Sequence, residues 1–258
     1  MKHKLRRIDS NNGRAYAYQD NDGTVTFLPS VTTVISLKPS TYLDTLEKEL
    51  GKETLQEIGH KAALRGTAMH NFIENYLMCI KQKGDKDSCL LYTQRKTTDG
   101  LLSNMEKKHI DEGRSLFYNM YHEGIFDRIK KIIFTEQFLY SLKYLFAGAA
   151  DLAYISHDNR IIITDFKSAS MEKDGEVIDK YKCQISAYCI AFEEMNNKKV
   201  HGGEIWLSHP DGIQIIEISS DEIEEKKIEF LKLCETFHEL WDTKPFKELL
   251  YKILKLDI

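Results

Sequence analysis

Apolar and polar residues alternate near the start of the chain in a way that predicts a β-hairpin. RAYAYQ (14–19) and TVTFL (24–28) both show the two-residue period of a half-buried strand. The segment from Asp20 to Gly23 supplies turn residues between them. After Pro29 we expect a short helix that has Ser30 as its N-cap.

A helical period follows the hairpin. Apolar residues recur every three or four positions over 41–50 and 54–77, which predicts amphipathic helices. Gly66 interrupts the second pattern and leaves one helix or two as alternatives. Residues 81–103 are polar, and we interpret them as a mobile loop or lid. A helical pattern returns at 105–121.

The second half of the chain combines short apolar runs with amphipathic segments. We expect strands at 132–139, 145–155, 160–166, 204–208 and 213–219, and helices at 181–195, 220–241 and 247–256. Together these elements predict an α/β protein with a central mixed sheet flanked by helices and a helical N-terminal part.

Composition narrows the class of protein. The 258 residues are 42% hydrophobic and 29% charged, which is typical of a soluble globular protein. No stretch approaches the ~20 apolar residues of a membrane span, and the basic start has no apolar run behind it. We therefore expect no membrane partner and a cytoplasmic location. The net charge of −4 does not exclude nucleic acid, because an enzyme can confine positive charge to one groove.

Five cysteines are present, an odd number without a C-x-x-C pair. This pattern argues against a disulfide framework or a zinc cluster. We expect reduced thiols.

Charged residues stand at the ends of two strongly apolar segments. Asp151 lies in one, and Asp165 and Lys167 close the next, two positions apart and therefore on the same side of a strand. An antiparallel hairpin would bring the two aspartates together. Carboxylates suit Mg²⁺ or Mn²⁺, and a neighbouring lysine could fix a phosphate or steer a water molecule. The plainer alternative is that these charges only mark strand ends.

The spacing Gly148…Asp151…Asp165-x-Lys167 resembles the PD-(D/E)XK nuclease motif. Four further features accompany it, namely Glu136, Gly66-Thr67-x-x-His70 with Glu74 one turn later, Gln184-x-x-x-Tyr188, and PSVTTV at 29–34. As an ordered set they resemble the RecB-like exonuclease branch of that superfamily. PSVTTV and the GTAMHNFIE segment are similar to mitochondrial genome maintenance exonucleases and related phage exonucleases.

This resemblance implies a restriction-endonuclease-like core and one nuclease domain over 1–258. Within it, 1–130 would hold the hairpin and the mainly helical part, 131–220 the catalytic sheet, and 221–258 the C-terminal helices. The implied activity is Mg²⁺- or Mn²⁺-dependent exonucleolytic hydrolysis of DNA, on single strands or flap ends, in replication, recombination or repair. Replication or recombination proteins are candidate partners, and a phage-encoded protein would act in the host cytoplasm.

Roles for individual residues also follow from the resemblance. Metal ligation is implied for His70, Asp151, Asp165 and the backbone carbonyl of Phe166. Lys167 would position or help activate the attacking water, Glu136 would lie beside the metal, and Gln184 would orient Lys167 or the phosphate. Substrate contacts are implied for Ser30, Thr32, Thr33, Ser168, Ser170 and Tyr188. Taken singly, each residue also has a structural explanation as a helix cap, strand end, surface or core residue.

Two other functions stay open at this point, a catalytically silent nucleic-acid-binding module on the same fold and a structure-specific endonuclease. The iron–sulfur variant of this branch needs one upstream cysteine and a downstream cluster of cysteines. Cys79 could be the first, but Cys183, Cys189 and Cys234 are widely separated. We therefore expect no iron–sulfur cluster.

Overall fold

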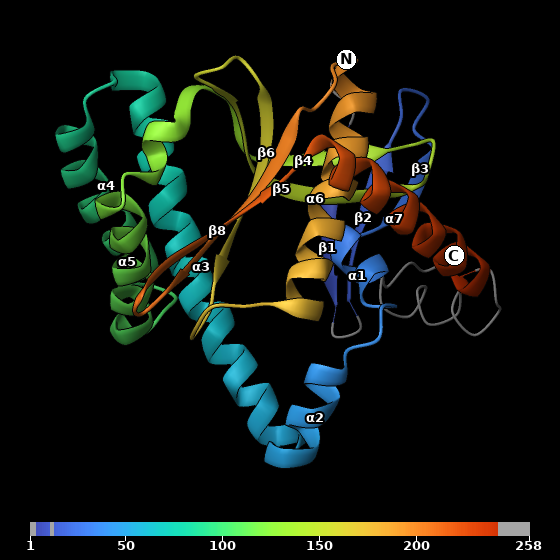
Figure 1. Cartoon of the computed structure of the whole chain (residues 1–258), viewed down its shortest axis with the longest axis horizontal. Coiled ribbons are helices and arrows are strands. Elements are labelled where there is room, and N and C mark those ends of the chain that lie inside the picture. Colours follow the sequence, from blue (N-terminus) through green and yellow to red (C-terminus); the bar gives the residue numbers. More distant parts are fainter. Residues whose placement is uncertain (1–3, 11–12, 242–258) are drawn as a thin grey trace.

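The computed structural model describes residues 4–10 and 13–241, and it contains two sheets with helices on both sides of the larger one (Figure 1). The larger sheet consists of β4 (Ile129–Ser141), β5 (Phe146–Ser156), β6 (Ile161–Ser168), β7 (Gly202–His209) and β8 (Gly212–Ile218), adjacent in that order. The pair β6 and β7 is parallel, and the other pairs are antiparallel. This mixed sheet with flanking helices confirms the predicted fold class.

The smaller sheet is antiparallel, with the order β1 (Lys4–Ser10), β2 (Gly13–Gln19) and β3 (Val25–Pro29). The pair β2 and β3 is the predicted hairpin, and the Thr24 amide donates to Asp20 Oδ1 in its turn (3.0 Å). Strand β1 was not predicted, because its basic sequence lacks a clear alternation. The apolar face of this sheet packs on Ala147 of β5, so the small sheet is in contact with the large one.

Helices cover both faces of the large sheet. On one face lie α3 (Lys52–Lys83) and α5 (Lys107–His122), and on the other lie α6 (Gly175–Asn196) and α7 (Ser220–Trp241) (Figure 1). Neighbouring residues of a strand point to opposite faces, so Ile205 packs with the α6 side and Trp206 with the α3 side. The predicted helix over 247–256 lies outside the described residues.

Shorter elements of the described chain are the helices α1 (Val31–Ile35) and α2 (Thr41–Leu50) and the 3₁₀ helix η1 (Ile125–Arg128). Ser30 is the N-cap of α1, as predicted, and its hydroxyl accepts the Thr33 amide (3.0 Å). Among the helices that the structure describes, none is long and apolar enough to cross a membrane.

Gly66 does not divide the long helix, because α3 runs through it as one element of 32 residues. A Cβ atom at this position would lie only 3.0 Å from the Ser168 hydroxyl. The glycine therefore lets α3 approach the end of β6 closely. The position that weakens the helical pattern in the sequence is the one that brings helix and sheet together.

The prediction of a mobile loop over 81–103 is wrong. Helix α4 (Lys86–Leu101) occupies most of this segment, and Asp85 caps it by accepting the Ser88 amide (2.9 Å). Cys89, Thr93 and Thr97 are buried at four-residue intervals, and Thr97 accepts a hydrogen bond from Asn75 of α3 (3.0 Å). Two of these three buried residues are threonines. A search for periodic apolar residues counts threonine as polar, so it does not detect the helical period of α4.

The expectation of reduced thiols is wrong for two of the five cysteines. Cys79 of α3 and Cys89 of α4 form a disulfide, with 5.5 Å between their Cα atoms. Cys183, Cys189 and Cys234 are free and buried, as expected. The misassigned loop is the reason for the error, because the facing helices that bring Cys79 and Cys89 together were not anticipated.

Candidate active site

The two predicted carboxylates meet where β5 and β6 separate. Regular pairing of these strands ends at Leu152 and Thr164. Beyond that point the Asp151 side chain takes the place of the backbone partner, because its Oδ2 accepts the Phe166 amide (2.6 Å). Asp151 is 7% exposed and Asp165 3%. Burying two acids this deeply at one strand end is costly unless cations or a metal compensate them.

His70 of α3 reaches this strand end from the side. Its Nε2 donates to the Phe166 carbonyl oxygen (3.0 Å), which leaves Nδ1 facing the acids. Nδ1 lies 3.4 Å from Glu136 Oε1 and 3.7 Å from Asp151 Oδ1. One donor atom from each of His70, Glu136 and Asp151 falls within 4.8 Å of the others. An imidazole nitrogen and two carboxylates at this spacing fit a divalent cation.

Glu136 holds an uncommon backbone conformation in the middle of β4. Its φ is 47°, in the left-handed region that non-glycine residues seldom adopt. Such a conformation persists in a strand only where the surroundings enforce it, and it clusters at functional sites. Here it accompanies a carboxylate that contacts His70.

Replacing Glu136 by Gly and by Ala separates this backbone strain from the loss of the carboxylate. Both variants lose the acid, but only Gly adopts positive φ without cost. We expect Glu136→Gly to be more stable than Glu136→Ala by about 1 kcal/mol, although Gly is usually the weaker residue in a strand. Urea unfolding of the two proteins measures the difference. Equal stabilities, or a more stable Ala variant, would show that the backbone is not strained.

A second group of side chains surrounds Lys167. Its ammonium lies 2.5 Å from Asp165 Oδ2 and donates to Gln184 Oε1 (3.1 Å). The amide of Gln184 in turn donates to Asp165 Oδ1 (2.8 Å) and to the Tyr188 hydroxyl (2.9 Å). Gln184 and Tyr188 lie one turn apart on α6, so the helix following β6 fixes the lysine and the acid of that strand.

Gly148 allows α6 to come this close. A Cβ atom at Gly148 would lie 2.6 Å from the Tyr188 ring and 3.1 Å from Val31 of α1. The glycine of the predicted motif therefore serves the packing of Tyr188 against β5.

The charges in the site shift one another's pKa values. Burial disfavours the charged form of His70, but Asp151 and Glu136 outweigh it and raise its pKa to about 9. Burial raises the pKa of Asp151 to about 8, against the opposing effect of His70. Burial also acts against the charge of Lys167, yet Asp165 and Asp151 raise its pKa above the ordinary value. Without metal, the site therefore retains protons at neutral pH, and Lys167 is an ammonium ion.

These shifts predict how pH affects the metal-free protein. His70 and Asp151 both have pKa values above those of the unfolded chain, so folding takes up protons and stability falls as pH rises through about 8 to 9. Thermal unfolding in EDTA at pH 6.5 and pH 9 should show this loss. The Asp151→Asn substitution should make this loss of stability smaller. A wild-type protein that is more stable at pH 9 than at pH 6.5 would contradict the raised pKa values of His70 and Asp151.

Metal binding should depend on pH in the opposite sense, because the ligands must release their protons. We expect affinity for Mn²⁺ to rise by up to roughly tenfold per pH unit while one proton is displaced. Calorimetric titration in two buffers of different ionisation enthalpy measures the proton release directly. An affinity independent of pH between 7 and 9 would exclude His70 and Asp151 as joint ligands.

The site opens into a cavity of about 540 Å³. Residues from the small sheet, α1, α3, β4, β5, β6 and α6 line it. Of the residues predicted from the sequence, it brings together Thr32, His70, Glu136, Asp151, Asp165, Phe166, Lys167, Ser168, Gln184 and Tyr188. Ser30, Thr33 and Ser170 are not among its lining residues. The hydroxyls of Ser30 and Thr33 bond to one another (2.8 Å), and Thr33 also donates to the Arg14 carbonyl (2.9 Å).

Two arginines of the small sheet were missed in the sequence. Arg7 and Arg14 line the same cavity, and both donate to the carboxylate of Asp9, at 2.8 Å and 2.9 Å. Two guanidinium groups share one acid, so this group of three residues carries a net positive charge on one side of the cavity. No motif marks these residues, and only the pairing of β1 with β2 shows that they belong to the site.

A mixed sheet that carries an aspartate on one strand and Asp-x-Lys on the next, beside a histidine and a glutamate, is the arrangement of a phosphodiester-cleaving enzyme. The model of the PD-(D/E)XK nuclease superfamily matches residues 41–251, and the chain belongs to this superfamily. It is therefore a nuclease by family, with a nucleic acid as substrate and divalent metal as the family's cofactor.

Comparison with solved structures gives distant similarities. A Eubacterium rectale protein described as "Putative exonuclease" is 9% identical, with 68% of each chain covered and a TM-score of 0.41. The protein SSO0001 is 17% identical, with 66% of this chain and 72% of that chain covered and a TM-score of 0.33. No curated protein matches the chain.

Proposed function

We propose that this nuclease is a Mg²⁺- or Mn²⁺-dependent deoxyribonuclease that hydrolyses single-stranded DNA or flap ends exonucleolytically. The observation that carries the proposal is the shared cavity in which the ammonium of Lys167, fixed by Asp165 and Gln184, faces the His70, Glu136 and Asp151 donors. Replication, recombination or repair of DNA would be its setting. We interpret the whole chain as one nuclease domain.

Nδ1 of His70 and the carboxylates of Glu136 and Asp151 would hold the divalent ion, with Asp165 and the Phe166 carbonyl nearby. A bound ion would polarise the phosphoryl oxygen and stabilise the charge that develops in the transition state. Nε2 of His70 donates to the Phe166 carbonyl, which fixes the ring so that Nδ1 faces the acids.

Lys167 acts as a cation and a hydrogen-bond donor in this proposal. Its raised pKa keeps it protonated at neutral pH, so it is not a general base. An ammonium group has three N–H bonds, and contacts to Asp165 and Gln184 occupy two of them. The ammonium also lies 4.8 Å from the centre of the Tyr181 ring, a weaker contact that a phosphate oxygen or the attacking water would replace in this proposal.

The size of the cavity supports a single-stranded substrate. A volume of about 540 Å³ is of the size of a nucleotide or two, and residues of the small sheet and of α3 line two of its sides, which favours a strand whose end enters the cavity. Arg7 and Arg14 are placed to bind a phosphate of the strand as it enters. Action from an end is supported by the resemblance of the ordered motifs, from Gly66-Thr67-x-x-His70 to Gln184-x-x-x-Tyr188, to RecB-like exonucleases.

The test is cleavage of end-labelled single-stranded and duplex DNA with Mg²⁺, with Mn²⁺ and with EDTA. We expect metal-dependent cleavage of the single strand, with the end label released as mononucleotides or short products. Internal cuts on duplex or branched DNA would replace the proposal by a structure-specific endonuclease. Binding without cleavage in any metal would replace it by a silent binding module.

A further inference from the structure

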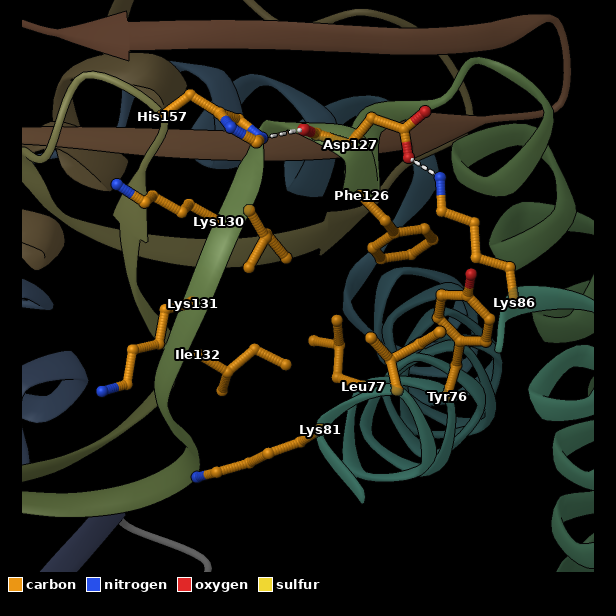
Figure 2. Close-up of a pocket in the computed structure, with 12 residues that line it drawn as sticks. Tyr76, Leu77, Lys81, Lys86, Phe126, Asp127, Lys130, Lys131, Ile132 and His157 are labelled. Carbon is orange, nitrogen blue, oxygen red and sulfur yellow. Dashed lines mark hydrogen bonds and ion pairs between the residues drawn. The ribbon is translucent and has the colours of Figure 1, made fainter. Parts of the chain in front are cut away.

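A second pocket (Figure 2) lies at the C-terminal end of α3 and the first residues of β4, whereas the active site uses the middle of this helix and of this strand. Its volume is about 760 Å³, and it is formed by the last turns of α3, the start of α4, η1, the first residues of β4 and the turn at His157. Lys81 stands eleven residues after His70 on α3, which places it roughly 16 Å further along the helix. The pocket is therefore separate from the catalytic cavity.

Apolar groups form the centre of this pocket and charged groups form its edge. Leu77, Phe126 and Ile132 lie near the centre in Figure 2, and Ile80 and Ile129 also line the pocket. Lysines surround them, namely Lys81, Lys86, Lys130 and Lys131. The pocket combines an apolar floor with a cationic rim.

Most of this positive charge is not compensated. Lys86 pairs with Asp127, but Lys81 donates to the carbonyl of Ile133 (3.2 Å) and Lys130 to the amide oxygen of Asn159 (2.6 Å). Both of these partners are neutral. Within residues 4–10 and 13–241, Lys81, Lys130 and Lys131 form no ion pair with a carboxylate. Three lysines therefore leave a positive field over an apolar surface.

We propose that this pocket docks an acidic segment of a partner protein that inserts one apolar side chain. The lysines would face its carboxylates, and Ile80 and Ile129, which are only half-buried, would contact the apolar side chain. The pocket also borders β4, the outermost strand of its sheet. The inference does not depend on which nucleic acid the active site cleaves.

A nucleic acid strand fits the pocket less well. Bases bind without sequence preference by stacking on exposed aromatic faces. Tyr76 and Phe126 are only 1% and 8% exposed, so their rings offer no stacking platform, and His157 at the edge is the one exposed ring among the lining residues. The remaining floor is aliphatic and has no donors or acceptors for base edges. An aliphatic or aromatic side chain matches it better than a nucleobase does.

The test measures binding of fluorescein-labelled short peptides, rich in Asp and Glu and carrying one Phe, Leu or Ile, by fluorescence anisotropy at low salt. Lys130→Glu/Lys131→Glu removes two rim charges and adds two acids. Lys198→Glu/Lys199→Glu is the matched control, because it makes the same change at two exposed adjacent lysines outside the pocket. A third variant, Ile80→Ser, removes apolar surface from the floor without a change in charge.

We expect the Lys130/Lys131 and Ile80 variants to bind the peptides roughly tenfold or more weakly than wild type, and the control to bind normally, with DNA cleavage unchanged in all three. Peptides with Asn and Gln for the acids, or Ser for the apolar residue, should also bind weakly. No binding by any acidic peptide, or equal loss in the control, would overturn the proposal. Loss of oligothymidylate binding with peptide binding intact would assign the pocket to the DNA strand instead.

Discussion

Asp151→Asn should lower the rate of metal-dependent cleavage by roughly a thousandfold or more, since it removes an anionic metal ligand while keeping the side chain's shape. The fold should survive, because the asparagine oxygen can still accept the Phe166 amide that Asp151 accepts now. The amide also avoids burying a charge. Single-turnover cleavage of labelled DNA in saturating Mg²⁺ measures the loss.

Asp211→Asn provides the matched control, because Asp211 is an exposed acid in the turn between β7 and β8. It should cleave at the wild-type rate. Calorimetry should also show weaker Mn²⁺ binding by Asp151→Asn only. An Asp151→Asn protein that cleaves within a few-fold of wild type would remove Asp151 from the metal site.

Lys167→Ala is expected to lower cleavage by roughly a hundredfold to a thousandfold, because one preorganised cationic donor to the developing charge is lost. Lys167→Arg should recover only part of the rate. A guanidinium keeps the charge, but its planar fork does not reproduce the contacts of the ammonium with Asp165 and Gln184. Binding of DNA in EDTA should change far less than cleavage does.

Lys198→Ala serves as the control for loss of a surface lysine. Lys167→Ala also leaves the buried carboxylate of Asp165 without its paired cation, so its unfolding must be compared with wild type in the presence of Mn²⁺, which supplies positive charge nearby. If a folded Lys167→Ala protein cleaves at the wild-type rate, the positioning role of Lys167 is excluded.

The parts of the site that are local in sequence could be predicted. Asp151 and Asp165 lie on neighbouring strands of one hairpin, so period and spacing were enough to group them. Spacing also placed Gln184 and Tyr188 on one face of the next helix, but only the resemblance to a family linked them to the acids. The same local patterns predicted the mixed sheet and its flanking helices. No alignment was needed for these elements, since each apolar period matches its secondary structure.

The parts that depend on packing between distant segments could not be predicted from residues alone. His70 contacts Glu136 across 66 residues and Phe166 across 96, and only the resemblance to a family pointed to His70. Arg7 and Arg14 reach the cavity because a strand without an apolar period pairs with β2. Helix α4 was missed because Thr93 and Thr97, polar by composition, form its buried face.

The close approach of α3 to the sheet at Gly66 has a consequence for motion. His70 stands one turn beyond this glycine, and the other donors of its cluster sit on β4 and β5. An ion bound by these donors together would cross-link the helix to the sheet. Local opening of α3 would then require His70 to dissociate from the metal. Amide hydrogen exchange along the middle of this helix would therefore slow when metal binds. Weaker packing of α3 on the sheet would conversely speed dissociation of the metal. The packing of α3 therefore influences how long the metal stays bound to the enzyme.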